Sequence, residues 1–105
     1  MDNSIHILDK IKNIVKKNAP LAKIYLYGSR VRKTSHKESD WDILILLAQE
    51  KITNEIEEKI TDPLYDLEFE LGEIISPIIY SENEWNTKYS VTPFYQNVMK
   101  EGKLL

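Results

Sequence analysis

The spacing of apolar residues predicts a helix and then two β-strands in the first half of the chain. Near the start, apolar residues recur every three or four positions, which is the spacing of one helical face. They are Ile5, Leu8, Ile11 and Val15. The segment NAPL at residues 18–21 breaks this pattern, and AKIYLY at residues 22–27 predicts a short strand that Gly28 ends. The nearly continuous apolar run WDILILL at residues 41–47 predicts a strand buried on both faces.

A longer helical region is predicted at residues 53–71. Pro63 divides this region, with Asp62 as the N-cap and Pro63 at the first position of a second helix. Leucines at intervals of three and four residues then share one face, and Gly72 ends the helix. We therefore expect a break in the middle of this helical region.

The last third of the chain predicts a third strand and two helix starts. EIISPIIY at residues 73–80 reads as a strand whose proline, Pro77, indicates an edge position or a bulge. SENEW at residues 81–85 is a capping box, the arrangement in which side chains three residues apart cap a helix start. The final helix has Thr92 as its cap and Pro93 at its first position.

This order of helix, strand, strand, helix, strand and helix predicts an α/β (α+β) fold with a small mixed β-sheet and helices packed on it. At 105 residues the chain has the size of one domain, and we expect residues 1–105 to form it. Aromatic residues of the last third are expected to cover the sheet, with a partner-binding patch or base stacking by one of them as open alternatives. They are Trp85, Tyr89, Phe94 and Tyr95.

Composition narrows the classes of function. Charged residues make up 30% and the formal net charge is -3, so we expect no overall basic surface and no sequence-specific nucleic-acid partner. The chain has no cysteine, which excludes disulfides and thiolate zinc sites. No apolar run approaches the length of a membrane span, so we expect a cytoplasmic protein with no membrane partner.

Two aspartates open the most apolar strand. Asp40 and Asp42 are two residues apart, so on a strand both side chains project from the same face, with Trp41 pointing the other way. Two carboxylates about 5 Å apart repel by roughly 3 kcal/mol at an effective dielectric constant near 20. A fold tolerates this repulsion if both groups reach water or if a divalent cation lies between them. Hard oxygen ligands favour Mg²⁺ or Mn²⁺.

A candidate phosphate cradle follows the preceding strand. Gly28 allows a phosphate to approach the backbone, and Ser29 offers both a hydroxyl and an N–H group to an anion. Arg30 and Arg32 add positive charge, with Lys33 and Lys37 further along the loop. A phosphate cradle beside a carboxylate pair indicates metal-assisted chemistry on a nucleotide.

The stretch GSRVRKTSHKESDWDILILL resembles the signature of the DNA polymerase β-like nucleotidyltransferase superfamily, in which a Gly-Ser pair precedes D-x-D in an apolar strand. Its form looks like the minimal nucleotidyltransferases of the MNT antitoxin type. The resemblance implies a palm-type fold in which Gly28 and Ser29 hold the phosphates and Asp40 and Asp42 bind two Mg²⁺ ions. It also implies transfer of a nucleoside monophosphate, most often from ATP, to a hydroxyl of a partner protein. In MNT-type systems this partner is a HEPN-domain toxin that is modified on a tyrosine.

One position departs from that signature. The superfamily usually has a third acidic residue on the next strand, and here the hydrophobic register places Ser76 there. Glu73 is three residues earlier and is expected to face away, while most of the acidic side chains of residues 66–70 are expected to face water. A hydroxyl is a poor Mg²⁺ ligand and a poor base, so a missing acid–base group predicts a loss of about 10²–10⁴-fold in rate.

Two alternatives to a transferase acting on a protein stay open. The absence of the third acid favours a catalytically impaired nucleotide binder, or an antitoxin or adaptor that works by contact alone. Transfer to a small molecule such as an aminoglycoside ranks last, because enzymes of that kind generally carry an additional acceptor-binding domain.

Overall fold

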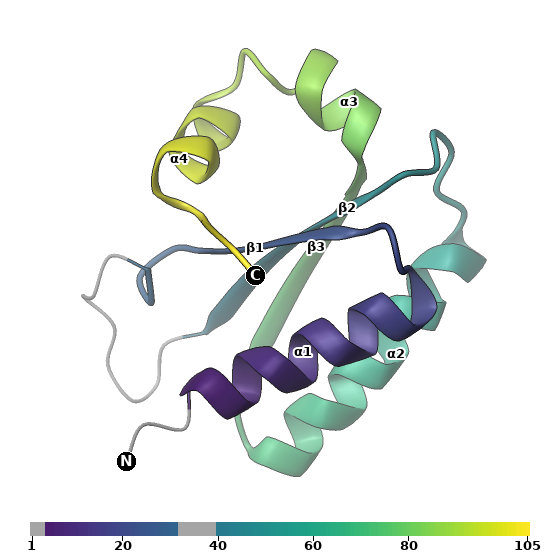
Figure 1. Cartoon of the computed structure of the whole chain (residues 1–105), viewed down its shortest axis with the longest axis vertical. Helices are drawn as coiled ribbons and strands as arrows, with labels where there is room; N and C mark the ends of the chain where they lie inside the picture. The colour runs from purple at the N-terminus through teal and green to yellow at the C-terminus, as the bar shows by residue number, and fades with distance from the viewer. Residues whose placement is uncertain (1–3, 32–39) are drawn as a thin grey trace.

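The computed structural model describes residues 4–31 and 40–105 of the chain. These residues form a four-stranded mixed sheet with helices on both faces (Figure 1). The elements in chain order are α1 (Ser4–Asn18), β1 (Lys23–Tyr27), β2 (Trp41–Leu47), α2 (Asn54–Leu71), β3 (Ile75–Ser81), α3 (Glu82–Thr87), α4 (Pro93–Glu101) and β4 (Lys103–Leu104). The predicted fold class and the predicted order of the longer elements are confirmed.

The strands lie in the order β3-β2-β1-β4. β2 pairs with β3 in parallel and with β1 antiparallel, and β1 also pairs antiparallel with β4. β3 therefore lies at an edge, as Pro77 indicated. β4 was not predicted, because two residues are too short to show an alternating pattern.

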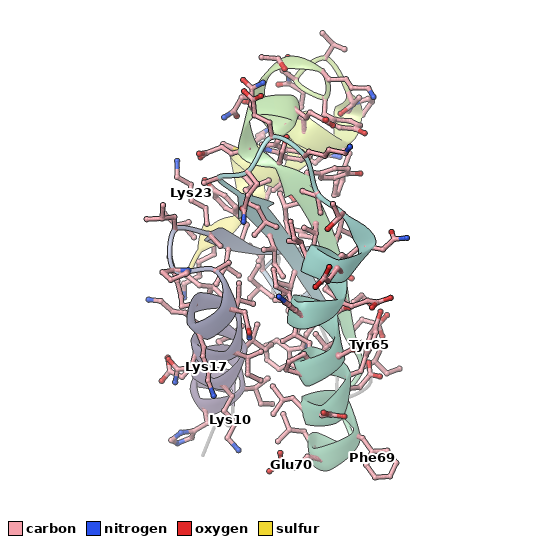
Figure 2. The ribbon with its side chains drawn as sticks, turned by 90° about the vertical axis from the view of Figure 1, so that its right-hand side faces the viewer. Lys10, Lys17, Lys23, Tyr65, Phe69 and Glu70 are labelled. Carbon is pink, nitrogen blue, oxygen red and sulfur yellow. The ribbon has the colours of Figure 1, made fainter. Side chains whose placement is uncertain are left out.

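One face of the sheet, here called the helix-pair face, packs against α1 and α2. Ile11 and Val15 of the predicted α1 stripe are fully buried, and Leu8 is partly buried. The side chain of Ile5 lies outside the described part of the chain. Figure 2 shows the two helices side by side, with Lys10 and Lys17 pointing away from the sheet. The apolar stripe thus builds the core, while Lys10 and Lys17 are exposed to water.

The opposite face, here called the aromatic face, is covered by α3 and α4 (Figure 1). Leu44 and Leu46 of β2 pack there against Trp85 and Val98. Trp85 is fully buried, and its ring lies 5.7 Å from that of Tyr80 in a stacked arrangement. The predicted cover of the sheet by the C-terminal aromatic residues is confirmed.

β2 is the centre of both cores, as its apolar run predicted. Its residues alternate between the two faces, with Ile43 and Ile45 on the helix-pair face and Leu44 and Leu46 on the aromatic face. Each is at most 3% exposed. Full burial of such a side chain contributes about 1.5–3 kcal/mol, so this strand carries a large share of the stability.

The predicted break at Pro63 is wrong, because α2 is one continuous helix with Pro63 inside it. Thr53 is the N-cap, and its hydroxyl accepts a hydrogen bond from the backbone N–H of Ile56. An interior proline costs about 3 kcal/mol or more. Ile60 before it and Leu64 after it are both buried in the same core, so packing of one continuous face offsets that cost.

The end of α2 was predicted correctly. Gly72 adopts φ 68° and its N–H donates to the carbonyl of Glu68 at 2.9 Å, which is a left-handed helix end that favours glycine. None of the described helices is long and apolar enough to span a membrane.

The register of α2 yields a prediction on stability. Leu64 is fully buried, whereas Phe69 on the same helix is 93% exposed and points outward (Figure 2). We expect Leu64→Ala to lower the free energy of unfolding by about 2–5 kcal/mol, because it leaves a cavity in the core. Phe69→Ala is the matched control and should change it by no more than about 0.5 kcal/mol. Equal losses in urea denaturation would contradict this orientation of the helix.

Candidate functional site

The end of β1 and the start of β2 bring Gly28 against Asp42. Tyr27 pairs with Asp42 across the two strands, and Gly28 follows with φ 83°. A Cβ atom at this position would overlap the carboxylate oxygen Oδ2 of Asp42 and would lie 3.3 Å from its Cγ. Glycine is therefore required for two reasons, the backbone conformation and the closeness of the carboxylate. The first residue of the predicted cradle and one of the two predicted acids are in contact.

The two aspartates point to the same side of β2, as their spacing predicted. Trp41 between them is buried in the core of the helix-pair face. Strand alternation places Asp42 on the aromatic face, on the side of Leu44. Asp40 directly precedes the strand and is exposed, whereas Asp42 is partly exposed. Both carboxylates thus lie at the start of β2, at the border of the core and in reach of water.

Ser76 is the neighbour of this acidic pair on β3. It pairs with Asp42 in the parallel register, and its hydroxyl donates to Oδ2 of Asp40 at 3.5 Å. The sequence prediction that Ser76 stands beside the acids is confirmed. Within residues 4–31 and 40–105, no three or more acidic, histidine or cysteine side chains are grouped so as to hold a metal ion. The oxygen ligands available here are the carboxylates of Asp40 and Asp42 and the hydroxyl of Ser76.

This set of oxygen atoms fits a divalent cation that keeps other ligands. Mg²⁺ is usually held by one or two carboxylates, with waters and substrate phosphates completing its octahedron. Asp40 and Asp42 supply two such carboxylates. The cradle at Gly28 lies directly beside Asp42, where phosphate oxygens would complete the set. The residues fit a cation that arrives with a nucleotide better than one held by the protein alone.

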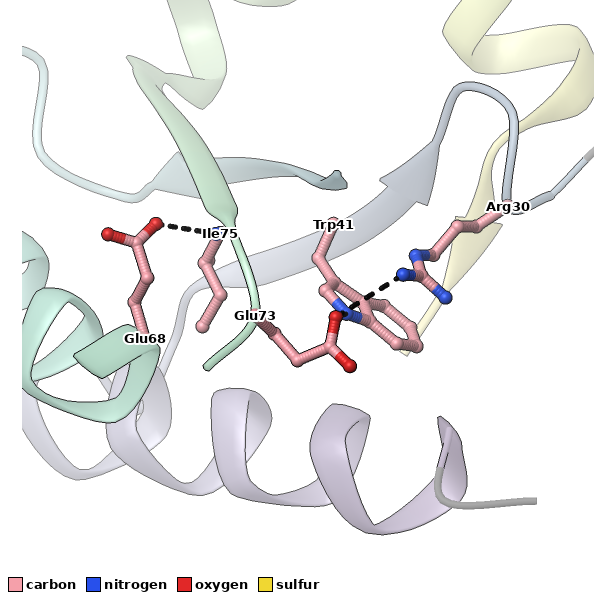
Figure 3. A network of polar contacts seen from close by, with 5 residues as sticks. All are labelled: Arg30, Trp41, Glu68, Glu73 and Ile75. Atoms are coloured by element: carbon pink, nitrogen blue, oxygen red, sulfur yellow. Dashed lines mark hydrogen bonds and ion pairs between the residues drawn. The ribbon is translucent and has the colours of Figure 1, made fainter. Parts of the chain in front are cut away.

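The other acids near the site serve the fold. Glu73 accepts a hydrogen bond from the indole Nε1 of Trp41 at 3.3 Å, so it faces the helix-pair side, away from the acidic pair, as expected (Figure 3). Glu68 departs from the expected solvated face, because its Oε2 accepts the backbone N–H of Ile75 at 2.7 Å. This bond ties the end of α2 to the start of β3. Asp66 is exposed, as expected.

Arg30 is held on the same side as Trp41. Its guanidinium carbon lies 3.8 Å above the Trp41 ring, and one of its nitrogens is 3.5 Å from Glu73 (Figure 3). Such a cation–π contact contributes about 0.5–2 kcal/mol. These contacts brace the turn after β1 against β2 and the segment between α2 and β3, and they lie on the opposite face from Asp42. Ser29 directly follows Gly28 in the turn, whereas Arg32, Lys33 and Lys37 lie outside the described residues.

Tyr27 borders the site as a neutral phenol. Its burial, and to a smaller extent the carboxylate of Asp42 and Tyr80, raise the pKa of Tyr27 to about 12. Its ring also meets that of Phe94 edge to face, with centroids 5.3 Å apart. The hydroxyl therefore stays protonated across the physiological range.

The sequence prediction favoured a cover of the sheet for the aromatic residues of α4 and left base stacking open, but it did not predict the hollow beside this helix. This hollow, of about 250 Å³, is lined by Tyr27, Gly28, Phe94, Asn97, Val98 and Glu101. The signal in the sequence was the spacing of Phe94, Asn97 and Glu101, which places an aromatic and two polar side chains on one helical face. Such a pattern is common on surface helices. It matters here because Gly28 lines the same hollow.

Comparison with known proteins identifies a family and structures of similar fold. The family model described as "Polymerase beta, Nucleotidyltransferase" matches residues 9–105. A solved toxin–antitoxin structure with AMP-PNP is similar over 91% of this chain and 69% of that chain, with a TM-score of 0.64 and 26% identity. Two mutants of the toxin–antitoxin MntA-HpeT are similar at 24% identity, with TM-scores of 0.63 and 0.61, over 91% and 93% of this chain and 69% and 70% of theirs. No curated protein sequence matches the chain significantly.

Gly28 and Gly72 form a matched pair for testing the site. Both have a positive φ, but a Cβ at Gly72 would meet nothing within 4 Å, whereas one at Gly28 would overlap Asp42. We expect Gly72→Ala to cost about 1 kcal/mol of stability and to leave binding of ATP with Mg²⁺ unchanged. Gly28→Ala should lower that affinity at least about tenfold, because the carboxylate must move. Equal affinities of the two variants in calorimetric titration would show that this contact does not shape a nucleotide site.

The pKa of Tyr27 predicts a loss of stability at high pH. The folded chain holds this proton up to about pH 12, whereas the unfolded chain releases it near 10.0. Stability from the neutral phenol is therefore fully present below pH 10 and is lost as the pH rises toward 12. We expect the free energy of unfolding to fall less steeply over this window in Tyr27→Phe than in the wild type. Identical slopes in alkaline urea denaturation would contradict a partly buried, neutral Tyr27.

Proposed function

The chain belongs to the polymerase β nucleotidyltransferase family, and we propose that it transfers AMP from ATP to a hydroxyl group of a partner protein. In this proposal residues 1–105 act as one cytoplasmic domain, the antitoxin of a toxin–antitoxin pair whose toxin carries a HEPN domain. The observation that carries the proposal is the contact of Gly28 with Asp42, beside Asp40 and Ser76. The 26% identity to a toxin–antitoxin crystallised with AMP-PNP supports both the nucleotide and the partner.

Gly28 and Ser29 bind the phosphates in this mechanism. With no side chain and φ 83°, Gly28 lets the phosphate oxygens reach the backbone N–H groups of the turn. The Ser29 hydroxyl is the next donor. Arg30 keeps the turn in place through Trp41 and Glu73. Arg32 is proposed to add positive charge toward the phosphates.

Asp40 and Asp42 orient the reacting phosphate. Both carboxylates would hold Mg²⁺ (or Mn²⁺), which supplies neutralisation of the triphosphate and of the charge that develops on the leaving pyrophosphate. In the transfer, the acceptor oxygen bonds to the α-phosphorus while the bond from this phosphorus to the bridging oxygen breaks. The acceptor proton must leave at the same time, and Ser76 is a poor base for it. We therefore propose slow transfer, with water or an aspartate taking the proton.

A contact-only antitoxin is the second candidate, and Ser76 is the observation that favours it. In that case, replacing Asp40 or Asp42 with an uncharged residue would have no effect on the partner. Asp40→Asn would then leave neutralisation of the toxin intact. In the transferase proposal the same substitution removes neutralisation while binding to the toxin survives.

Substitutions at Asp42 and Ser76 test the transferase proposal in opposite directions. We expect Asp42→Asn to lower the affinity for ATP with Mg²⁺ by about ten- to a hundredfold, because a charged ligand is lost. Ser76→Asp places a carboxylate beside Asp42 and should raise AMP transfer by about 10²-fold or more. The readout is label moved from ATP, radiolabelled at its α-phosphate, to the toxin.

Two controls complete this test. Asp66→Asn removes an exposed carboxylate of α2 and should change neither readout. Ser76→Ala removes only the hydroxyl and should not increase transfer. If Asp42→Asn binds ATP with Mg²⁺ as well as the wild type does, the acids are not a metal site and the proposal fails.

A further inference from the structure

The hollow between the end of β1 and α4 shares Gly28 with the proposed phosphate cradle. Gly28 belongs to both, because it ends β1 beside Asp42 and also forms part of the wall of the hollow. A nucleotide whose phosphates rest on Gly28 must place its sugar and base close to Gly28, because only a few bonds join them to the phosphates. The hollow, of about 250 Å³, is the recess that this backbone position reaches.

The aromatic wall of the hollow is held in a fixed position. The ring of Phe94 meets that of Tyr27 at 5.3 Å and 74°, and that of Trp85 at 5.5 Å and 81°. Trp85 is fully buried, so it cannot move away, whereas Phe94 is only partly buried. Fixed aromatic rings at the edge of a recess are suited to flat apolar groups, and stacking of a base on such a ring contributes about 1–3 kcal/mol.

The helix that carries Phe94 is anchored at both ends. The hydroxyl of Thr92 accepts the N–H of Tyr95 at 3.1 Å and caps the start. At the other end, the N–H of Gly102 donates to the carbonyl of Val98 at 2.6 Å, and β4 then pairs with β1. The pairing of β4 with β1 keeps the last turn of α4 beside the strand that ends at Gly28. The hollow is thus built from regular elements, which gives a binding site its precision.

Two polar side chains stand at the rim, one helical turn apart. Asn97 and Glu101 are both exposed and line the hollow. The amide of Asn97 presents one acceptor and one donor, which match N6–H and N7 of adenine, whereas guanine presents two acceptors at the corresponding edge. A carboxylate such as Glu101 repels phosphates but accepts hydrogen bonds from ribose hydroxyls.

We propose that this hollow receives the nucleoside of the triphosphate and selects adenine. The base lies against Phe94 and Tyr27, Asn97 pairs with its edge, and Glu101 accepts from the ribose. Selectivity for adenine then comes from α4, while affinity for the phosphates comes from Gly28 and the acidic pair. This inference rests on the proposed function, because it assumes that a nucleotide occupies the cradle.

The test compares three ligands, each with Mg²⁺: ATP, GTP and tripolyphosphate, titrated calorimetrically into the full chain. We expect the wild type to prefer ATP over GTP. Asn97→Ala should lose about tenfold in affinity for ATP, the scale of a lost bidentate pair, and should keep its affinity for tripolyphosphate. Asn97 is exposed, so the variant should fold normally.

Gln96→Ala is the matched control, because Gln96 is the neighbouring amide on α4 and bonds to the carbonyl of Ser90 at 3.0 Å, away from the hollow. It should bind all three ligands as the wild type does. If Asn97→Ala binds ATP unchanged, the adenine site is overturned and the proposed function stands. If the wild type binds neither ATP nor tripolyphosphate, both are overturned.

Discussion

The burial of β2 on both faces is the constraint on which the rest of the structure depends. The strand pairs with a neighbour along each edge, and its side chains alternate between two separate cores. No other strand has both faces so fully covered within the described residues. Because a shift of one residue would exchange the two sets of side chains, the register of β2 is strongly specified. The same register fixes Asp42 against both Tyr27 and Ser76.

The acidic pair is tolerated because it lies where this buried strand begins, at the border of the core. Two neighbouring carboxylates repel each other, and exposure to water weakens this repulsion. Asp40 is exposed and receives the Ser76 hydroxyl, and Asp42 is partly exposed. A third carboxylate in place of Ser76 would add two further repulsive pairs. The serine thus lowers the electrostatic cost of folding without a cation.

Most of the fold could be predicted from the chain, because its apolar periodicities are regular and its helix ends carry distinct capping residues. The stripe of α1, the caps at Ser81 and Thr92, and the turn at Gly72 are all local signals, whereas the cap at Thr53 was missed and Asp62 was expected in its place. Pro63 misled because a local breaking signal was overridden by burial on either side of it. Local sequence does not show how much burial of Ile60 and Leu64 stabilises the helix, so the cost of Pro63 could not be compared with it.

The candidate site was predictable only in part. Spacing gave the shared face of Asp40 and Asp42, and hydrophobic register gave the neighbouring Ser76. The contacts of Arg30 with Trp41 and Glu73 were not predictable, because they join three segments that are distant in the chain. The position of Arg30 beside a Gly-Ser turn suggested that it binds phosphate. Its described contacts with Trp41 and Glu73 instead lie on the helix-pair face, opposite Asp42.

The proline of β3 has a consequence for association with other chains. The ladder of β3 with β2 is unbroken from Ile75 to Ser81, so the nitrogen of Pro77, which carries no hydrogen, belongs to the outer side of this edge strand. An incoming strand would find a missing donor in the middle of the edge it must pair with. Edge-to-edge aggregation and partner recognition by strand addition are both disfavoured there. At the β3 edge, binding of a partner through side-chain contacts is therefore favoured over addition of a strand.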